Sequence, residues 1–174
     1  MKIPLLPKRA LTVISITALA VACRPDRKMS SLAPEIWKDH IATNDDRSGF
    51  ERGTTFLSIY SEIHVRNQEE VRPLTATASI HNPNMLDTIY VETANYYNTK
   101  GVLIRTYFPR TVFIRPMETV QIVIDGIDSA GGTGANFIFE WARPPGSADP
   151  LMEAVMISPY GQPAISFTTS GKRL

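Results

Sequence analysis

Short runs in which apolar and polar residues alternate occupy most of the chain after residue 53. In residues 74–80 an apolar or small side chain takes every second position, from Leu74 to Ile80. Such alternation places one set of side chains on the buried face of a strand and the other set in water. Similar runs lie at residues 54–65, 88–97, 102–108, 111–114, 120–124, 136–142, 151–157 and 164–168. Together these runs predict about eight short β-strands.

The residues between these runs indicate how the strands connect. Proline, glycine and asparagine interrupt the chain at intervals typical of antiparallel strands, and Gly101 suits the turn of a β-hairpin. Phe137, Phe139 and Trp141 recur at every second position, as in the core stripe of a central strand. No alternation of strands and helices is visible, which argues against a Rossmann-type or P-loop enzyme. We therefore expect an all-β fold, an immunoglobulin-like antiparallel β-sandwich.

The first 22 residues have the composition of a removable signal peptide. Lys2, Lys8 and Arg9 flank or precede an uncharged apolar run, residues 10–22, which is shorter than the roughly 20 residues that a membrane-spanning helix needs. The whole chain has 18 Lys and Arg against 17 Asp and Glu, and without these three cations the balance becomes 15 against 17. A weakly acidic mature protein has no electrostatic reason to bind nucleic acid.

Cys23 is the single cysteine of the sequence. It excludes an intrachain disulfide and a zinc site built from several thiolates. The preceding Ala20-Val21-Ala22 resembles the lipobox of bacterial lipoproteins, in which the cysteine thiol receives a lipid. An ordinary secretory signal, cleaved near Ala22 and leaving a free thiol, is the alternative. We expect a lipid on Cys23 to anchor the protein to a membrane of the bacterial envelope, facing the periplasm or the cell exterior.

Residues 23–53 separate the lipid site from the folded body. Charged residues, serine, asparagine and glycine are frequent in them, as in a flexible tether. Within this segment we expect residues 34–41 to form a short helix that buries Ile36, Trp37 and Ile41. The predicted domains are therefore a signal peptide over residues 1–22, a lipid site and tether over residues 23–53, and a β-sandwich over residues 54–174.

Several blocks of the body resemble a known family. The most distinctive are Gly131-Gly132-Thr133-Gly134-Ala135-Asn136-Phe137 and Glu153-Ala154-Val155-Met156-Ile157; the others are Tyr60-Ser61, Ile80-His81-Asn82, Trp141, Gly161 and Ser166-Phe167. Over roughly residues 54–171 the chain is similar to the bacterial domain-of-unknown-function family 3124 (DUF3124), in particular its lipoprotein-type members. The body also looks like a bacterial immunoglobulin-like module. The resemblance implies no activity, because the family has none assigned.

A glycine-rich loop before residues 136–142 is the first candidate site. Its candidate residues are Asp125, Asp128, Gly131, Gly132, Gly134 and Asn136. A phosphate-binding loop needs a helix N-terminus after the glycines, whereas a predicted strand follows here. Asp125 and Asp128 could bind calcium together with loop carbonyls, because that ion prefers oxygen ligands. A tight connection between strands explains the same residues, and we favour it.

Tyrosines and an arginine form the second candidate site, a partner surface. Its residues are Tyr90, Tyr96, Tyr97, Arg105 and Tyr107. Both residue types are enriched at binding hot spots, so they could recognise an envelope protein or a glycan. Cross-strand pairs on a solvated sheet face would give the same sequence.

Glu62 and His64 are the third candidate. Alternate positions of one strand put both side chains on the same face, at a spacing that permits proton transfer. A solvated surface pair is the commoner meaning of that spacing. The histidines show no metal-ligand spacing, and no serine lies in a G-x-S-x-G motif. We therefore assign no catalytic residue and no metal ligand from the sequence.

These patterns favour a non-catalytic binding or structural module, held at a membrane by the lipid on Cys23. We expect no cofactor, no metal ion and no nucleic-acid partner. One alternative is an envelope hydrolase that uses Glu62 and His64 or the loop of residues 131–136. The other alternative is a calcium-stabilised adhesion module.

Overall fold

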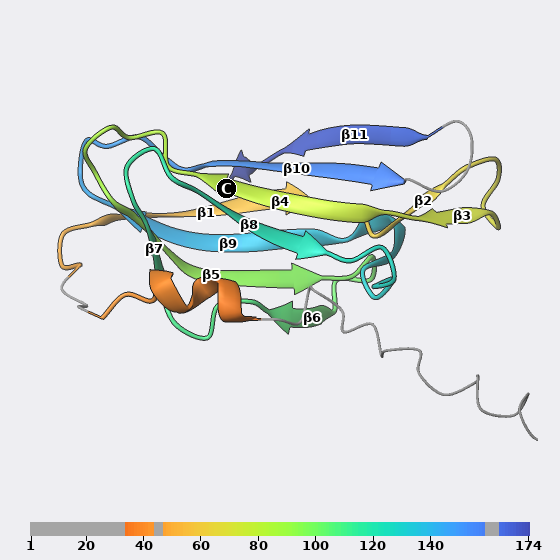
Figure 1. Cartoon of the computed structure of the whole chain (residues 1–174), viewed down its shortest axis with the longest axis horizontal. Coiled ribbons are helices and arrows are strands. Elements are labelled where there is room, and N and C mark those ends of the chain that lie inside the picture. The colour runs from red at the N-terminus through yellow and green to blue at the C-terminus, as the bar shows by residue number, and fades with distance from the viewer. Residues whose placement is uncertain (1–33, 44–46, 159–163) are drawn as a thin grey trace, which may run out of the picture.

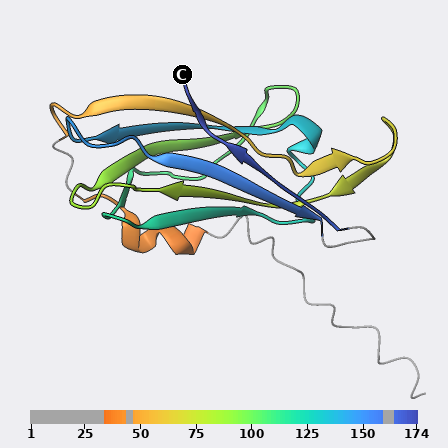
Figure 2. The same ribbon diagram turned by 90° about the horizontal axis from the view of Figure 1, so that it is seen from above.

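The computed structural model describes residues 34–43, 47–158 and 164–174, and in them two antiparallel sheets stack around one core (Figure 1). The six-stranded sheet contains, in order, β12 (Lys172–Arg173), β1 (Glu51–Ser58), β9 (Asn136–Arg143), β5 (Ile89–Tyr97) and β6 (Leu103–Thr106), with β7 (Val112–Ile114) paired to β5. The four-stranded sheet contains β11 (Ile165–Ser170), β10 (Leu151–Ser158), β4 (Thr75–His81) and β8 (Thr119–Ile124). A ribbon of β2 (Glu62–His64) and β3 (Val71–Pro73) projects from one end, as Figure 2 also shows.

The predicted all-β, immunoglobulin-like antiparallel sandwich is confirmed. Burial alternates along the strands as the sequence pattern predicts, so that Ala76 and Ala78 of β4 are fully buried. From the other sheet, the rings of Phe137 and Phe139 stack with centroids 5.0 Å apart, and Trp141 is buried beside them. Small side chains on one inner face and large rings on the other allow two sheets to interdigitate.

The prediction of one continuous strand over residues 54–65 is wrong, because the chain forms two separate strands there. β1 ends at Ser58, and the chain leaves the sheet before it forms β2. Between the two strands the Ser61 N–H donates to the Gly132 carbonyl at 3.2 Å. In a continuous strand this N–H would have bonded to a neighbouring strand, but here it bonds to the glycine-rich loop. No local sequence pattern predicts a partner so far along the chain.

A short 3-10 helix, η2 (Pro34–His40), packs on the body where the sequence predicted a short helix. Trp37 is only 6% exposed, and its ring meets that of Phe108 edge-on at 4.6 Å between centroids. Ile41, just after the helix, forms a bridge with β7. Part of the segment expected to act as a tether is therefore packed against the sandwich.

The leader, Cys23 and the beginning of the expected tether lie outside the described residues. The division into leader, lipid site, tether and body thus stays a prediction. None of the helices in the described part of the chain has the length and apolar character that crossing a membrane requires.

Candidate functional site

The glycine-rich loop joins β8 of one sheet to β9 of the other and includes the short helix η3 (Gly132–Gly134). Two of its N–H groups donate hydrogen bonds inside the protein. The Gly132 N–H donates to Ser61 Oγ at 2.8 Å, and the Gly134 N–H donates to Thr99 Oγ1 at 2.9 Å. A phosphate cradle needs such N–H groups free to face a ligand. The geometry therefore agrees with a tight structural connection.

Tyr96 packs directly against this loop. A Cβ atom added at Gly131 would overlap the Tyr96 hydroxyl oxygen, which is why glycine is required there. Tyr96 is fully buried, so the prediction that placed it on an exposed partner surface is wrong. Burial raises the pKa of its hydroxyl above the ordinary value, and the nearby Ser61 hydroxyl offsets this only in part. No hydrogen bond of good geometry reaches the Tyr96 hydroxyl within the described residues.

A largely buried ion pair closes the same end of the sandwich. Arg105 Nη1 donates to Asp128 Oδ2 at 3.0 Å and to the Tyr107 hydroxyl at 2.6 Å, and the Asp128 side chain is 3% exposed. Burial raises the pKa of Tyr107, against the opposing effect of Arg105. Asp125 Oδ1 accepts the Ile127 N–H at 3.2 Å. A guanidinium beside Asp128 disfavours a calcium ion, so the geometry does not support the calcium-binding alternative.

The five residues predicted as a partner surface do not form one surface. Tyr90 and Tyr97 lie on the outer face of the six-stranded sheet, because their neighbours in β5 are buried. Tyr96 points into the core, and Arg105 with Tyr107 covers the end of that core. Consecutive residues of a strand alternate between its two faces, and this alternation divides the set.

Glu62 and His64 both lie in the short ribbon of β2 and β3. His64 is exposed, and the structure shows no hydrogen bond or ion pair between the two side chains in the described part of the chain. A shallow hollow beside His64 is lined by residues 65–68 of the ribbon's turn. Nothing in this arrangement supplies a nucleophile, so the hydrolase alternative gains no support from it.

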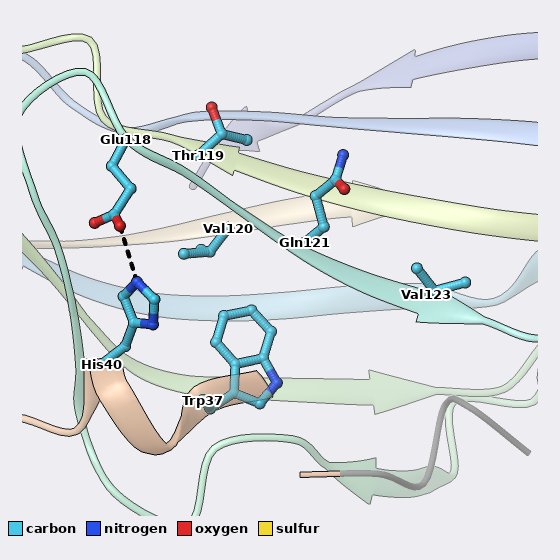
Figure 3. A pocket seen from close by; sticks show the side chains of 7 residues that line it. All are labelled: Trp37, His40, Glu118, Thr119, Val120, Gln121 and Val123. Carbon is cyan, nitrogen blue, oxygen red and sulfur yellow. Dashed lines mark hydrogen bonds and ion pairs between the residues drawn. The ribbon is translucent and has the colours of Figure 1, made fainter. Parts of the chain in front are cut away.

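A groove of about 280 Å³ lies between η2 and the edge strand β8 (Figure 3). Its lining residues are Trp37, His40, Glu118, Thr119, Val120, Gln121 and Val123. The helix supplies an indole and an imidazole, and the strand supplies the facing wall. Sequence reasoning missed this groove because its two walls are about eighty positions apart, although Trp37 in a predicted helix was a partial signal.

His40 and Glu118 link the two walls at one end of the groove. His40 Nε2 lies 3.0 Å from Glu118 Oε1, and the Arg115 N–H donates to Glu118 Oε2 at 2.7 Å. Burial acts to raise the pKa of Glu118, but the hydrogen bonds from His40 and the Arg115 N–H outweigh it and hold the pKa below its usual value. His40 Nδ1 is buried and has no hydrogen-bond partner among the described residues. The pair therefore fastens the helix to the sheet and lacks the nucleophile of a catalytic triad.

The unpaired backbone edge of β8 faces this groove. In the described part of the chain β8 pairs with β4 alone. The Asn82 N–H donates to the Glu118 carbonyl at 2.9 Å, so Glu118 and every second residue after it form hydrogen bonds with β4. Because bonded and unbonded residues alternate in an antiparallel pair, the N–H and C=O groups of Thr119, Gln121 and Val123 point away from β4. β8 contains no charge and no proline, which are common protections of a free edge.

Comparison with known proteins identifies a family and one structural similarity. A family model described as "Protein of unknown function (DUF3124)" matches residues 52–174, which include both sheets but not η2. A solved structure described as "Crystal Structure of Thermotoga maritima 1070" is similar over 69% of this chain and 92% of that chain, with 11% identity and a TM-score of 0.45. No curated protein matches the chain.

Proposed function

The chain belongs to the family described as Protein of unknown function (DUF3124), and we propose that it is a non-catalytic module that binds an extended peptide along the free edge of β8. One observation carries the proposal: within the described residues, the backbone groups of β8 that point away from β4 pair with no strand, and they lie beside the groove next to η2. An extended peptide binds such an edge as an additional strand. Its main chain supplies affinity, and pockets for alternate side chains supply specificity.

The lining of the groove indicates which peptide would fit. Neighbouring strands lie about 4.8 Å apart, so an added strand would run between β8 and η2. Its inward side chains would meet Trp37 and Val120, which favours apolar residues at every second position. Its outward side chains would lie beside Thr119 and Gln121, where polar residues suit these polar neighbours. A peptide with alternating apolar and polar residues is therefore the expected ligand.

The charges of the groove support a neutral ligand. Glu118 is the acidic residue of the lining, and both His40 and Arg115 already contact its carboxylate, at 3.0 Å and 3.3 Å. Among the described lining residues, a bound peptide therefore meets no uncompensated charge. Main-chain hydrogen bonds and apolar contacts would then dominate its affinity.

A proline substitution tests strand addition directly. Gln121→Pro removes one groove-facing N–H group without removing a bond to β4, whereas Gln121→Ala keeps that N–H and serves as the control. Short peptides would be selected from a displayed random library on the full chain, and their dissociation constants measured by fluorescence polarisation. We expect Gln121→Pro to weaken binding about tenfold and Gln121→Ala to change it less than about twofold. Equal binding by the proline variant and the unchanged chain would contradict the proposal.

We also propose that this module is lipid-anchored at the bacterial envelope through Cys23. The basic start, the apolar run and the small residues before the single cysteine support this placement. A Cys23→Ala variant should incorporate no labelled palmitate and should leave the membrane fraction. Continued labelling and membrane retention of that variant would show that the anchor lies elsewhere.

A further inference from the structure

The outer face of the four-stranded sheet is almost uncharged. Its outward side chains are Ser166, Thr168 and Ser170 on β11, Leu151, Glu153, Val155 and Ile157 on β10, Thr75, Thr77, Ser79 and His81 on β4, and Thr119, Gln121 and Val123 on β8. All of these lie in the described part of the chain, and Glu153 is the one with a formal charge. Most of the others are serine, threonine or aliphatic.

Exposed aliphatic side chains lie on β10 in the middle of this face, on either side of Glu153. Leu151 is 56% exposed, Val155 is 37% exposed and Ile157 is 46% exposed. The strand register places Val155 between Thr168 of β11 and Thr77 of β4, so threonine methyl groups extend the apolar strip sideways. Contiguous apolar surface on a soluble domain marks an interaction site more often than isolated apolar residues do.

We infer that this face binds the same face of a second copy of the chain. Sheets with small and aliphatic side chains stack about 10 Å apart with their strands nearly aligned. A two-fold axis between β10 and β4, parallel to the strands, stacks β10 of each copy on β4 of the other. Val155 then meets the partner's Thr77, and Glu153 meets the partner's Ser79, so the two carboxylates avoid each other. The contact is isologous and closes as a dimer.

The size of the face is enough for a weak dimer. Strands about 4.8 Å apart, with a rise of about 3.3 Å per residue, give four strands of this length a face of roughly 400–500 Å². Two such faces bury roughly 800–1,000 Å², which is at the lower end of specific interfaces. The dimer does not depend on the proposed peptide site, because its axis lies between β10 and β4, whereas the peptide groove lies beyond β8. Thr119, Gln121 and Val123 border both sites.

Cysteine crosslinking of the full chain in cells tests this contact. Val155→Cys places a thiol near the inferred axis, and Thr54→Cys places one on the outer face of the six-stranded sheet as a matched control. The chain with no added cysteine reports any reaction of Cys23. With a bismaleimide that spans about 10 Å, we expect the Val155→Cys chain to give at least about tenfold more crosslinked dimer than the Thr54→Cys chain.

A second substitution keeps the test independent of folding. Ile157→Lys, added to Val155→Cys, should lower the dimer about tenfold and leave the melting temperature unchanged, because Ile157 lies outside the core. Ile157 lies outside the peptide groove, so Ile157→Lys should leave peptide binding unchanged, which separates this inference from the proposed function. Equal crosslinking from both cysteines, no loss with Ile157→Lys, or a product whose mass is not twice that of the chain would each overturn it.

Discussion

The two outer faces of the sandwich meet their surroundings differently. On the six-stranded sheet, Arg52 Nε lies 3.2 Å from Glu92 Oε1, and the Thr93 hydroxyl donates to Glu140 at 2.9 Å. Among the described outward residues of the four-stranded sheet, Glu153 alone has a formal charge. Both sheets bury their inner faces in one core, so the fold does not require this difference. The uncharged face is the one that we infer to contact a second copy of the chain.

The largest expected effect compares an exposed ion pair with a buried one. Arg105→Ala leaves the buried Asp128 carboxylate without its guanidinium, and we expect a loss of about 3 kcal/mol in the free energy of unfolding. Arg52 is 61% exposed, so Arg52→Ala should cost at most about 1 kcal/mol. Urea denaturation of both variants measures the two losses. Equal losses would mean that the exposed ion pairs of the six-stranded sheet stabilise the fold as much as the buried pair does. The contrast between the two outer faces would then not hold.

An intermediate effect is expected in the loop that joins the two sheets. Gly131→Ala forces a methyl group against the Tyr96 hydroxyl, and we expect it to destabilise the protein by about 2–3 kcal/mol. In the matched control Gly134→Ala the new methyl group would lie 3.1 Å from Thr99 Cγ2, an exposed side chain that can shift, so the cost should stay below about 1 kcal/mol. Thermal unfolding distinguishes the two. An unchanged melting temperature for Gly131→Ala would show that the close contact between Gly131 and Tyr96 does not contribute to stability.

The smallest effect is a pH dependence shared by two carboxylates. The pKa of Glu118 lies below its usual value, as described above. Burial acts to raise the pKa of Asp149, but hydrogen bonds from Arg143 and Arg173 outweigh it and lower the pKa. A lowered folded pKa stabilises the protein above the unfolded pKa, about 3.9 for Asp and about 4.3 for Glu, and this stabilisation is lost as the pH falls through the folded pKa.

The free energy of unfolding should therefore be constant with respect to these two groups above about pH 5 and decrease below it. Asp149→Asn and Glu118→Gln should each make that decrease shallower, by a small amount because both carboxylates are partly exposed. Denaturant titrations between pH 5 and pH 2 measure it. An unchanged slope in both variants would show that neither carboxylate gains net stabilisation from its partners.

Local pattern predicted much of the fold but little of the site. Alternation located the main strands, and the aromatic stripe of β9 lies in the core as expected. The prediction of one strand over residues 54–65 was wrong because the chain leaves the sheet after Ser58 and the Ser61 N–H bonds to the Gly132 carbonyl. β3 was missed because it ends in a proline, which argues against a strand, and β12 because two basic residues show no alternation. The prediction of a five-residue partner surface was wrong because strand alternation places the Tyr96 side chain in the core.

By itself the sequence determined the strands, the composition of the core and the short helix with Trp37, because side-chain alternation and helix formation depend on neighbouring residues. Its prediction of a lipid on Cys23 is equally local and awaits its experiment. Tertiary structure alone decided that β8 is an edge strand and that His40 meets Glu118 beside it. Sheet order and pairing between distant residues arise from the packing of the whole chain, so no local pattern contains them.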